Sequence, residues 1–153
     1  MNLRDELPRL LPLAHEWARE QALFIQRSGR GLTISERKLA AGAGVEQPAL
    51  VRIAVVDQIP APTHPLLRTA CEQLDFLGRD TVGLTLGYSV YLRKEGSGSR
   101  QLLAHELRHA AQYEGYGSIE AYLDVYIRDL VRFGYANAPM ELDAQQAEAG
   151  RGL

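Results

Sequence analysis

Hydrophobic positions in the second half of the chain recur with two different periods. Within residues 81–95, every second residue from 82 to 92 is apolar or aromatic, which is the spacing of a half-buried β-strand. The pattern predicts one long strand, or two strands joined near Gly87. In residues 99–114 and 119–133, apolar positions instead recur every three or four residues, which predicts two helices.

The first half of the chain predicts helices on either side of one strand. Helical spacing covers residues 10–26, and a weaker pattern at 35–41 predicts a short helix. Residues 49–59 are rich in β-branched side chains and stop at "PAPTHP", which predicts a largely buried strand. Pro65 and Pro139 suit the first turns of two further helices, which we expect at 65–78 and 139–148.

These elements predict an α+β fold with a small, mixed or antiparallel sheet of about three strands covered by helices. The chain has 153 residues and a mass of 17.0 kDa, so we expect one compact domain. Residues 49–149 would form its body, with residues 1–48 as an N-terminal helical segment packed on it.

Composition excludes several classes of protein. With 17 basic and 19 acidic side chains and no block of like charge, the chain has no basic surface that would bind nucleic acid or an anionic membrane. Its only cysteine, Cys71, cannot form an internal disulfide and is expected to be a small buried residue of a helix. No apolar run resembles a signal peptide or a membrane span, so we expect a cytoplasmic protein.

The sequence H-E-x-x-H occurs in the helix predicted at 99–114, as His105, Glu106 and His109. Residues four apart on a helix project from the same side, with Cβ atoms about 6 Å apart, so both imidazoles can bind one ion. Neutral imidazoles suit tetrahedral zinc. Glu106 would lie beside that ion and accept the proton of a water molecule that the metal acidifies. Alternatively, the two histidines make only ordinary hydrogen bonds.

Zinc in such a site needs a third protein ligand. His15 and His64, the other two histidines, lie far upstream, whereas Glu141 lies one turn into the helix predicted at 139–148. Two histidines and one glutamate form a known zinc ligand set. Asp143 is a rival ligand, but its shorter side chain favours a role in orienting a histidine. Glu141 could instead simply stabilise the helix dipole.

On "HELRH" (residues 105–109) and "PMELDAQQA" (residues 139–147), the chain resembles the zincin metallopeptidases, and within them the gluzincins. "HELRHAAQYE" also looks like the metal-binding helix of small bacterial peptidase domains. The resemblance implies a zincin-like fold with H-E-x-x-H on the central active-site helix. It also implies that His105, His109 and Glu141 bind one Zn²⁺ and that Glu106 is the general base.

The resemblance further implies a peptide or protein substrate, bound along an edge strand near residues 85–92. No histidine follows Glu141, so the stabilisation of the substrate oxyanion would fall to a tyrosine or to no residue at all. Tyr135 is the first candidate, because it directly precedes the Glu141 helix. The other five tyrosines considered are expected mostly to pack; they are Tyr88, Tyr113, Tyr116, Tyr122 and Tyr126.

We therefore expect a zinc metallopeptidase that hydrolyses peptide bonds. An alternative is a zincin-fold, zinc-binding regulatory or interaction module without proteolytic activity. A further alternative is a structural interaction domain in which His105 and His109 bind no metal.

Overall fold

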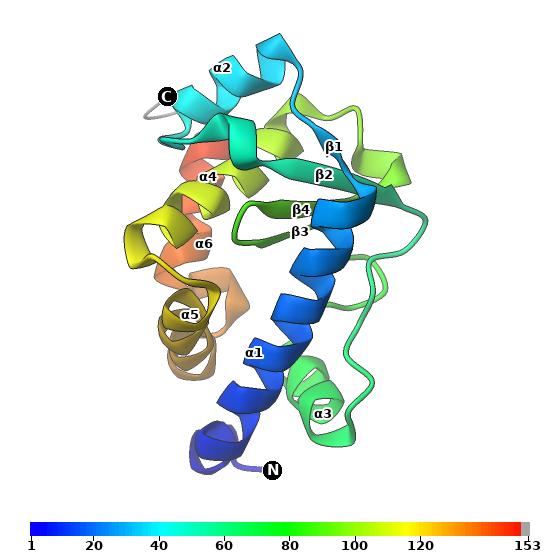
Figure 1. The fold of residues 1–153 in the computed structure, drawn as a ribbon. Helices are drawn as coiled ribbons and strands as arrows, with labels where there is room; N and C mark the ends of the chain where they lie inside the picture. The colour runs from blue at the N-terminus through cyan, green and yellow to red at the C-terminus, as the bar shows by residue number, and fades with distance from the viewer. Residues whose placement is uncertain (151–153) are drawn as a thin grey trace.

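A mixed four-stranded sheet lies at the centre of the computed structural model, which describes residues 1–150 (Figure 1). The strands are β1 (Arg30–Gly31), β2 (Arg52–Val56), β3 (Gly83–Leu86) and β4 (Ser89–Arg93). Their order is β1-β2-β4-β3; β2 and β4 are parallel, and both outer pairs are antiparallel. The predicted α+β class is confirmed, with one strand more than expected. That strand, β1, lies in the segment 1–48 and is too short to produce a period-two pattern.

Within residues 1–150, six α-helices surround the sheet. They are α1 (Leu3–Ser28), α2 (Ile34–Gly42), α3 (Pro65–Gln73), α4 (Arg100–Tyr116), α5 (Ile119–Phe133) and α6 (Pro139–Glu148). Helix α1 packs against α5 and β4, while α4 contacts β3 and lies beside α6 (Figure 1). None of the described helices is both long enough and apolar enough to span a membrane.

The segment with alternating apolar residues forms two strands joined in a hairpin near Gly87, which is the second of the two predicted arrangements. Leu86 pairs with Ser89 across a turn in which Gly87 has a φ of 70°. The hairpin corrects the expected substrate edge. Of the two hairpin strands, only β3 lies at an edge of the sheet, whereas residues 89–92 belong to β4, which is enclosed between β2 and β3. The edge strand of the hairpin is therefore Gly83–Leu86 alone, and Leu84, Thr85 and Leu86 are buried.

Two predicted helices have bounds that differ from the prediction by more than two residues. Helix α1 begins at Leu3 instead of residue 10 and continues through Pro8 and Pro12. Helix α3 ends at Gln73 instead of Gly78. The chain then turns through left-handed conformations at Asp75 and Leu77, with φ of 52° and 57°. This turn directs three apolar side chains into the core, Leu74, Phe76 and Leu77, which a continued helix would spread around its axis.

Candidate metal centre

Helix α4 carries the H-E-x-x-H residues on its buried side. The helix begins at Ser99, whose hydroxyl accepts the Leu102 N–H at 3.1 Å, and ends at Gly117, which has a φ of 83°. Its apolar stripe, which includes Leu103, Leu107 and Ala110, packs under the sheet. The stripe fixes the rotation of the helix, so that Glu106 and His109 are only 4% and 6% exposed.

Helix α6 brings Glu141 to these histidines. Pro139 occupies the first turn of the helix, and Glu141 follows within the same turn, 2% exposed. One carboxylate oxygen lies 3.1 Å from His105 Nε2 and the other lies 3.0 Å from His109 Nε2. Potential ligand atoms of all three residues lie within 4.8 Å of one another. The three residues predicted to bind zinc therefore converge on one point.

The outer nitrogen of His109 is held by a chain of hydrogen bonds. Gln112 Oε1 lies 2.8 Å from His109 Nδ1. The Gln112 amide nitrogen donates to Asp143 and to the Met140 carbonyl, at 2.8 and 3.0 Å, which fixes the orientation of the amide. His109 Nδ1 must then be the donor to Gln112, so a neutral His109 imidazole would carry its lone pair on Nε2. Asp143, which also accepts from Arg108 at 2.7 Å, thus acts on His109 through Gln112.

The outer nitrogen of His105 is held by a carboxylate. His105 Nδ1 lies 3.0 Å from Glu148 Oε2, and an ionised carboxylate can only accept. The Nε2 atoms of both histidines face the Glu141 carboxylate. Lone pairs on these nitrogens and on the carboxylate would repel one another, so a cation, either a proton or a metal ion, must lie between them. Burial lowers the pKa of His105, but Glu141, Glu106 and Glu148 together raise it to about 9.

Glu141 also behaves as an anion within this set. Burial raises its pKa, but hydrogen bonds from His105 and His109 outweigh burial and hold the pKa well below its usual range. Tyr126 adds a third hydrogen bond, because its hydroxyl donates to Glu141 Oε2 at 2.7 Å. Burial raises the pKa of Tyr126 well above its ordinary value, so the phenol keeps this proton.

The donor set could hold a zinc ion. Ligands about 2.0 to 2.1 Å from tetrahedral zinc lie roughly 3.3 Å from one another. The contacts of Glu141 with His105 and His109, at 3.1 and 3.0 Å, are close to that separation. Two neutral imidazoles and one carboxylate would leave a fourth position on the metal.

Strand β3 holds the Glu106 carboxylate beside this centre. Thr85 Oγ1 lies 2.8 Å from Glu106 Oε1 and 3.0 Å from the Glu106 carbonyl oxygen. On the other side, a Cβ on Gly83 would come within 2.7 Å of Glu106 Oε2, so a larger residue there would require the Glu106 carboxylate to shift. Burial raises the pKa of Glu106, and the nearby histidines oppose that shift. A buried carboxylate of raised pKa, fixed on two sides, can serve as a general base.

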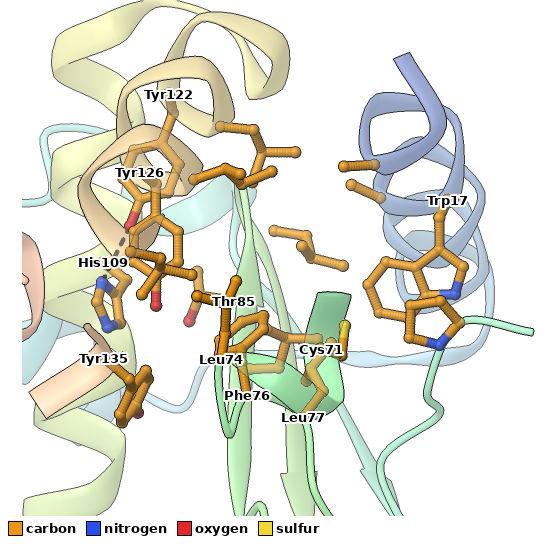
Figure 2. Close-up of a pocket in the computed structure, with 18 of the residues that line it drawn as sticks. Trp17, Cys71, Leu74, Phe76, Leu77, Thr85, His109, Tyr122, Tyr126 and Tyr135 are labelled. Atoms are coloured by element: carbon orange, nitrogen blue, oxygen red, sulfur yellow. Dashed lines mark hydrogen bonds between the residues drawn. The ribbon is translucent and has the colours of Figure 1, made fainter. Parts of the chain in front are cut away.

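Tyrosines surround the centre from α5 and from the turn before α6. Tyr122 and Tyr126 stack with ring centroids 5.4 Å apart, and the Tyr122 hydroxyl lies 3.2 Å from His109 Nδ1. Tyr135 lies beside His109 (Figure 2), packs on Phe76 and is 39% exposed. Burial, followed by the charge of Glu141, raises the pKa of Tyr135. Tyr122 and Tyr126 were expected mostly to pack, but their hydroxyls contact His109 and Glu141, two of the predicted zinc ligands.

The other two histidines lie away from the centre. His15 Nε2 lies 2.7 Å from Asp124 Oδ1 and links α1 to α5. His64 caps α3, where its Nδ1 accepts the Leu66 N–H at 3.2 Å.

A cavity of about 90 Å³ extends from the candidate metal centre between α1, α3, α5 and β3. His105, Glu106, His109 and Glu141 line one end. In Figure 2, Trp17 of α1 faces His109 and Tyr135 across this space. Cys71 also lines the cavity; burial raises its pKa to about 11, so the thiol stays protonated.

No family model, curated protein or solved structure matches this chain. Inferences about its function therefore rest on its own residues and their geometry.

Proposed function

We propose that the chain is a zinc-dependent peptidase with a zincin-like, gluzincin-type architecture. His105, His109 and Glu141 would hold one Zn²⁺. The observation that carries the proposal is the convergence of these three donors, with the Glu106 carboxylate buried beside them on the same helix. When bound, the zinc would acidify a water molecule and polarise the carbonyl of the peptide bond.

Glu106 moves the proton in this proposal. Its Oε1 accepts the Thr85 hydrogen bond, which leaves Oε2 to take a proton from the attacking water. The raised pKa of Glu106 makes the carboxylate a stronger base near neutral pH. The same carboxyl group then protonates the amine that leaves when the peptide bond breaks. Tyr135 is the candidate donor to the substrate oxyanion, since its raised pKa keeps its proton in place.

The free edge of β3 would hold the substrate. The Arg93 N–H donates to the Val82 carbonyl at 2.8 Å. Because paired and unpaired positions alternate in antiparallel strands, the main-chain groups of Gly83 and Thr85 point away from β4. Leu84, Thr85 and Leu86 are only 9%, 5% and 3% exposed, so an extended peptide would have to reach this edge through the cavity in order to add as a further strand. Gly83, Thr85 and Glu106 line the same cavity, so a peptide on this edge would lie next to the general base.

Zinc content and peptide cleavage test the proposal in the purified protein and in two variants. We expect one zinc per chain and cleavage of a peptide library by the unmodified protein. Glu106→Gln should keep its zinc and lose about 10²- to 10⁴-fold in cleavage rate. Glu72→Gln is the matched control, since Glu72 is exposed on α3, and should change neither. A chain that takes up no zinc would overturn the metal site, and full activity in Glu106→Gln would overturn the mechanism.

A second candidate function is a zinc-binding module without proteolytic activity. The burial of Glu106 and of the ligands favours it, because a substrate can reach them only through the cavity. The same experiment separates the two functions: stoichiometric zinc without cleavage of any peptide would identify the binding module.

A further inference from the structure

The cavity has an apolar part that the proposed chemistry does not use. Its walls come from α1 and α3, on the side opposite the histidines (Figure 2). The residues that line it there include Leu10, Ala14, Trp17, Ala18, Leu67 and Ala70. The turn after α3 adds Leu74, Phe76 and Leu77. None of these nine described residues carries a charge, so this part of the cavity suits an uncharged, apolar group.

The space depends on small residues in fixed positions. Ala14, Ala18 and Ala70 are buried on helices that contact each other, and larger side chains there would fill the cavity. Leu10 and Leu67 pack together in the same apolar cluster and hold the two helices in register. The walls are therefore preformed and belong to regular helices, apart from the turn after α3.

The volume limits what can enter. A dry, apolar cavity of about 150 Å³ binds benzene. The whole cavity here, including the end lined by the histidines, measures about 90 Å³, so its apolar part suits at most a small aliphatic group, such as the side chain of leucine, isoleucine or methionine. An indole ring or a long acyl chain is too large for it.

The position of the cavity indicates which molecule carries this aliphatic group. Residues 83–86, the edge strand of the hairpin, and Glu106 line the same cavity as Leu67 and Ala70. Side chains alternate along a strand, so a peptide added to β3 would direct one side chain toward α1 and α3. Its peptide bond would then lie near Glu106.

We infer that the α1–α3 part of the cavity selects peptide substrates with an aliphatic side chain next to the cleaved bond. This inference rests on the proposed peptidase function. It gives α1, and with it the segment 1–48, a role in substrate choice, since Leu10, Trp17 and Ala18 form one wall.

Cleavage of matched peptides tests the substrate preference. The peptides have a single cleavable bond and differ only in one residue beside it, with the variation made on each side in turn. For the preferred side, leucine, isoleucine and methionine should give a kcat/KM roughly 10- to 50-fold above alanine, from burial of the added methylene groups. Aspartate and tryptophan should be poorer than leucine. Equal rates for leucine, alanine and aspartate on both sides would overturn the inference.

Two variants change the size of the cavity. Ala70→Leu should remove most of the preference for leucine over alanine while zinc content stays unchanged. Leu67→Ala enlarges the same region and should shift the preference toward phenylalanine. The control is Ala41→Leu on the exposed side of α2. If Ala70→Leu fails to fold, Leu67→Ala still tests the wall; an unchanged preference in the folded variants would contradict the inference.

Trp17, the only tryptophan, gives a readout that does not need catalysis. In Glu106→Gln, its fluorescence should shift on titration with a leucine-containing peptide and not with the aspartate counterpart. If the fluorescence shift is selective but the unmodified protein cleaves no peptide, the peptidase proposal is wrong and the selectivity for an aliphatic side chain is still supported. A shift with decanoate but with no peptide would overturn the peptide as the occupant. No shift with the leucine peptide would overturn the site.

Discussion

Within residues 1–150, two places bring imidazole next to carboxylate at hydrogen-bond distance. His15 and Asp124 meet at 2.7 Å between α1 and α5, and the Asp124 side chain is 45% exposed. His105 and His109 meet Glu141 at 3.1 and 3.0 Å between α4 and α6, where the Glu141 side chain is 3% exposed. The three contacts have similar distances, but the surroundings of the two places differ.

The difference shows what separates a metal site from an ion pair. His15 offers Asp124 one nitrogen, in contact with solvent. At the other site, two imidazoles share one carboxylate, and Gln112 and Glu148 occupy their outer nitrogens. Because the outer nitrogens donate, the Nε2 lone pairs of the two imidazoles in their neutral form would point at the same place. Convergence of oriented donors, more than distance, therefore distinguishes the candidate metal centre.

The largest expected effect comes from removing the shared carboxylate. Glu141→Gln should lose high-affinity zinc binding, because a neutral amide is a poor zinc ligand. If free zinc is held near 1,000 times its Kd, the variant should lose about 4 kcal/mol of zinc-dependent stabilisation. Thermal unfolding with zinc and with a chelator measures this. Asp124→Asn is the matched control and should keep the full zinc effect; an equal loss in both variants would contradict the distinction.

The next effect concerns the base held by β3. Thr85→Val removes the hydrogen bond to Glu106 Oε1 while keeping the shape of the side chain. Hydrogen bonds to charged groups contribute about 2 kcal/mol, so kcat should fall roughly 30-fold with unchanged zinc content. Steady-state kinetics and metal analysis check this prediction. Thr69→Val, on the exposed face of α3, is the control. Loss of zinc in Thr85→Val would show instead that β3 supports the ligands.

A smaller effect is expected from the residue that orients His109. Gln112→Ala removes the acceptor for His109 Nδ1 and breaks the link to Asp143. Loss of such a partner commonly weakens metal binding by about 10- to 100-fold. Competition with a zinc indicator measures the affinity, with Gln101→Ala, on the exposed side of α4, as the control. An unchanged affinity in Gln112→Ala would mean that the α4–α6 packing alone orients the imidazole.

The smallest effect is expected for the His15–Asp124 pair. His15→Asn removes the contact with Asp124 between α1 and α5. A partly exposed ion pair contributes about 0 to 1 kcal/mol, so the free energy of unfolding should change by less than about 1 kcal/mol. Urea denaturation provides this value, and zinc affinity should not change. A weakening of zinc binding here would show that the two regions are coupled through α5.

The elements that give a strong periodic signal could be predicted from the sequence. The strands β3 and β4 alternate along their length, and α4 and α5 have serine at their starts and glycine at their ends. The start of α1 was missed, since the helix extends through Pro8 and Pro12 into a region with little pattern. The end of α3 depends on left-handed residues, Asp75 and Leu77, whose conformation is set by tertiary packing.

Part of the candidate site is local in the sequence and part is not. The spacing of His105 and His109 fixes their common side on α4, and Glu141 is a carboxylate one turn into a later helix. Thr85 and Tyr126 lie on other elements, and their contacts with Glu106 and Glu141 arise only when those elements meet. The spacing of Tyr122 and Tyr126 did place them on one face of α5, but sequence alone does not show which residues that face meets.

A crystal structure of the protein grown with zinc, with anomalous diffraction at the zinc edge, tests the central claim most directly. We expect one anomalous peak, with the ion about 2.0 to 2.2 Å from His105 Nε2, His109 Nε2 and a Glu141 oxygen. A map with no peak there, and with both imidazoles still bonded directly to Glu141, would contradict the metal site and the peptidase function proposed from it.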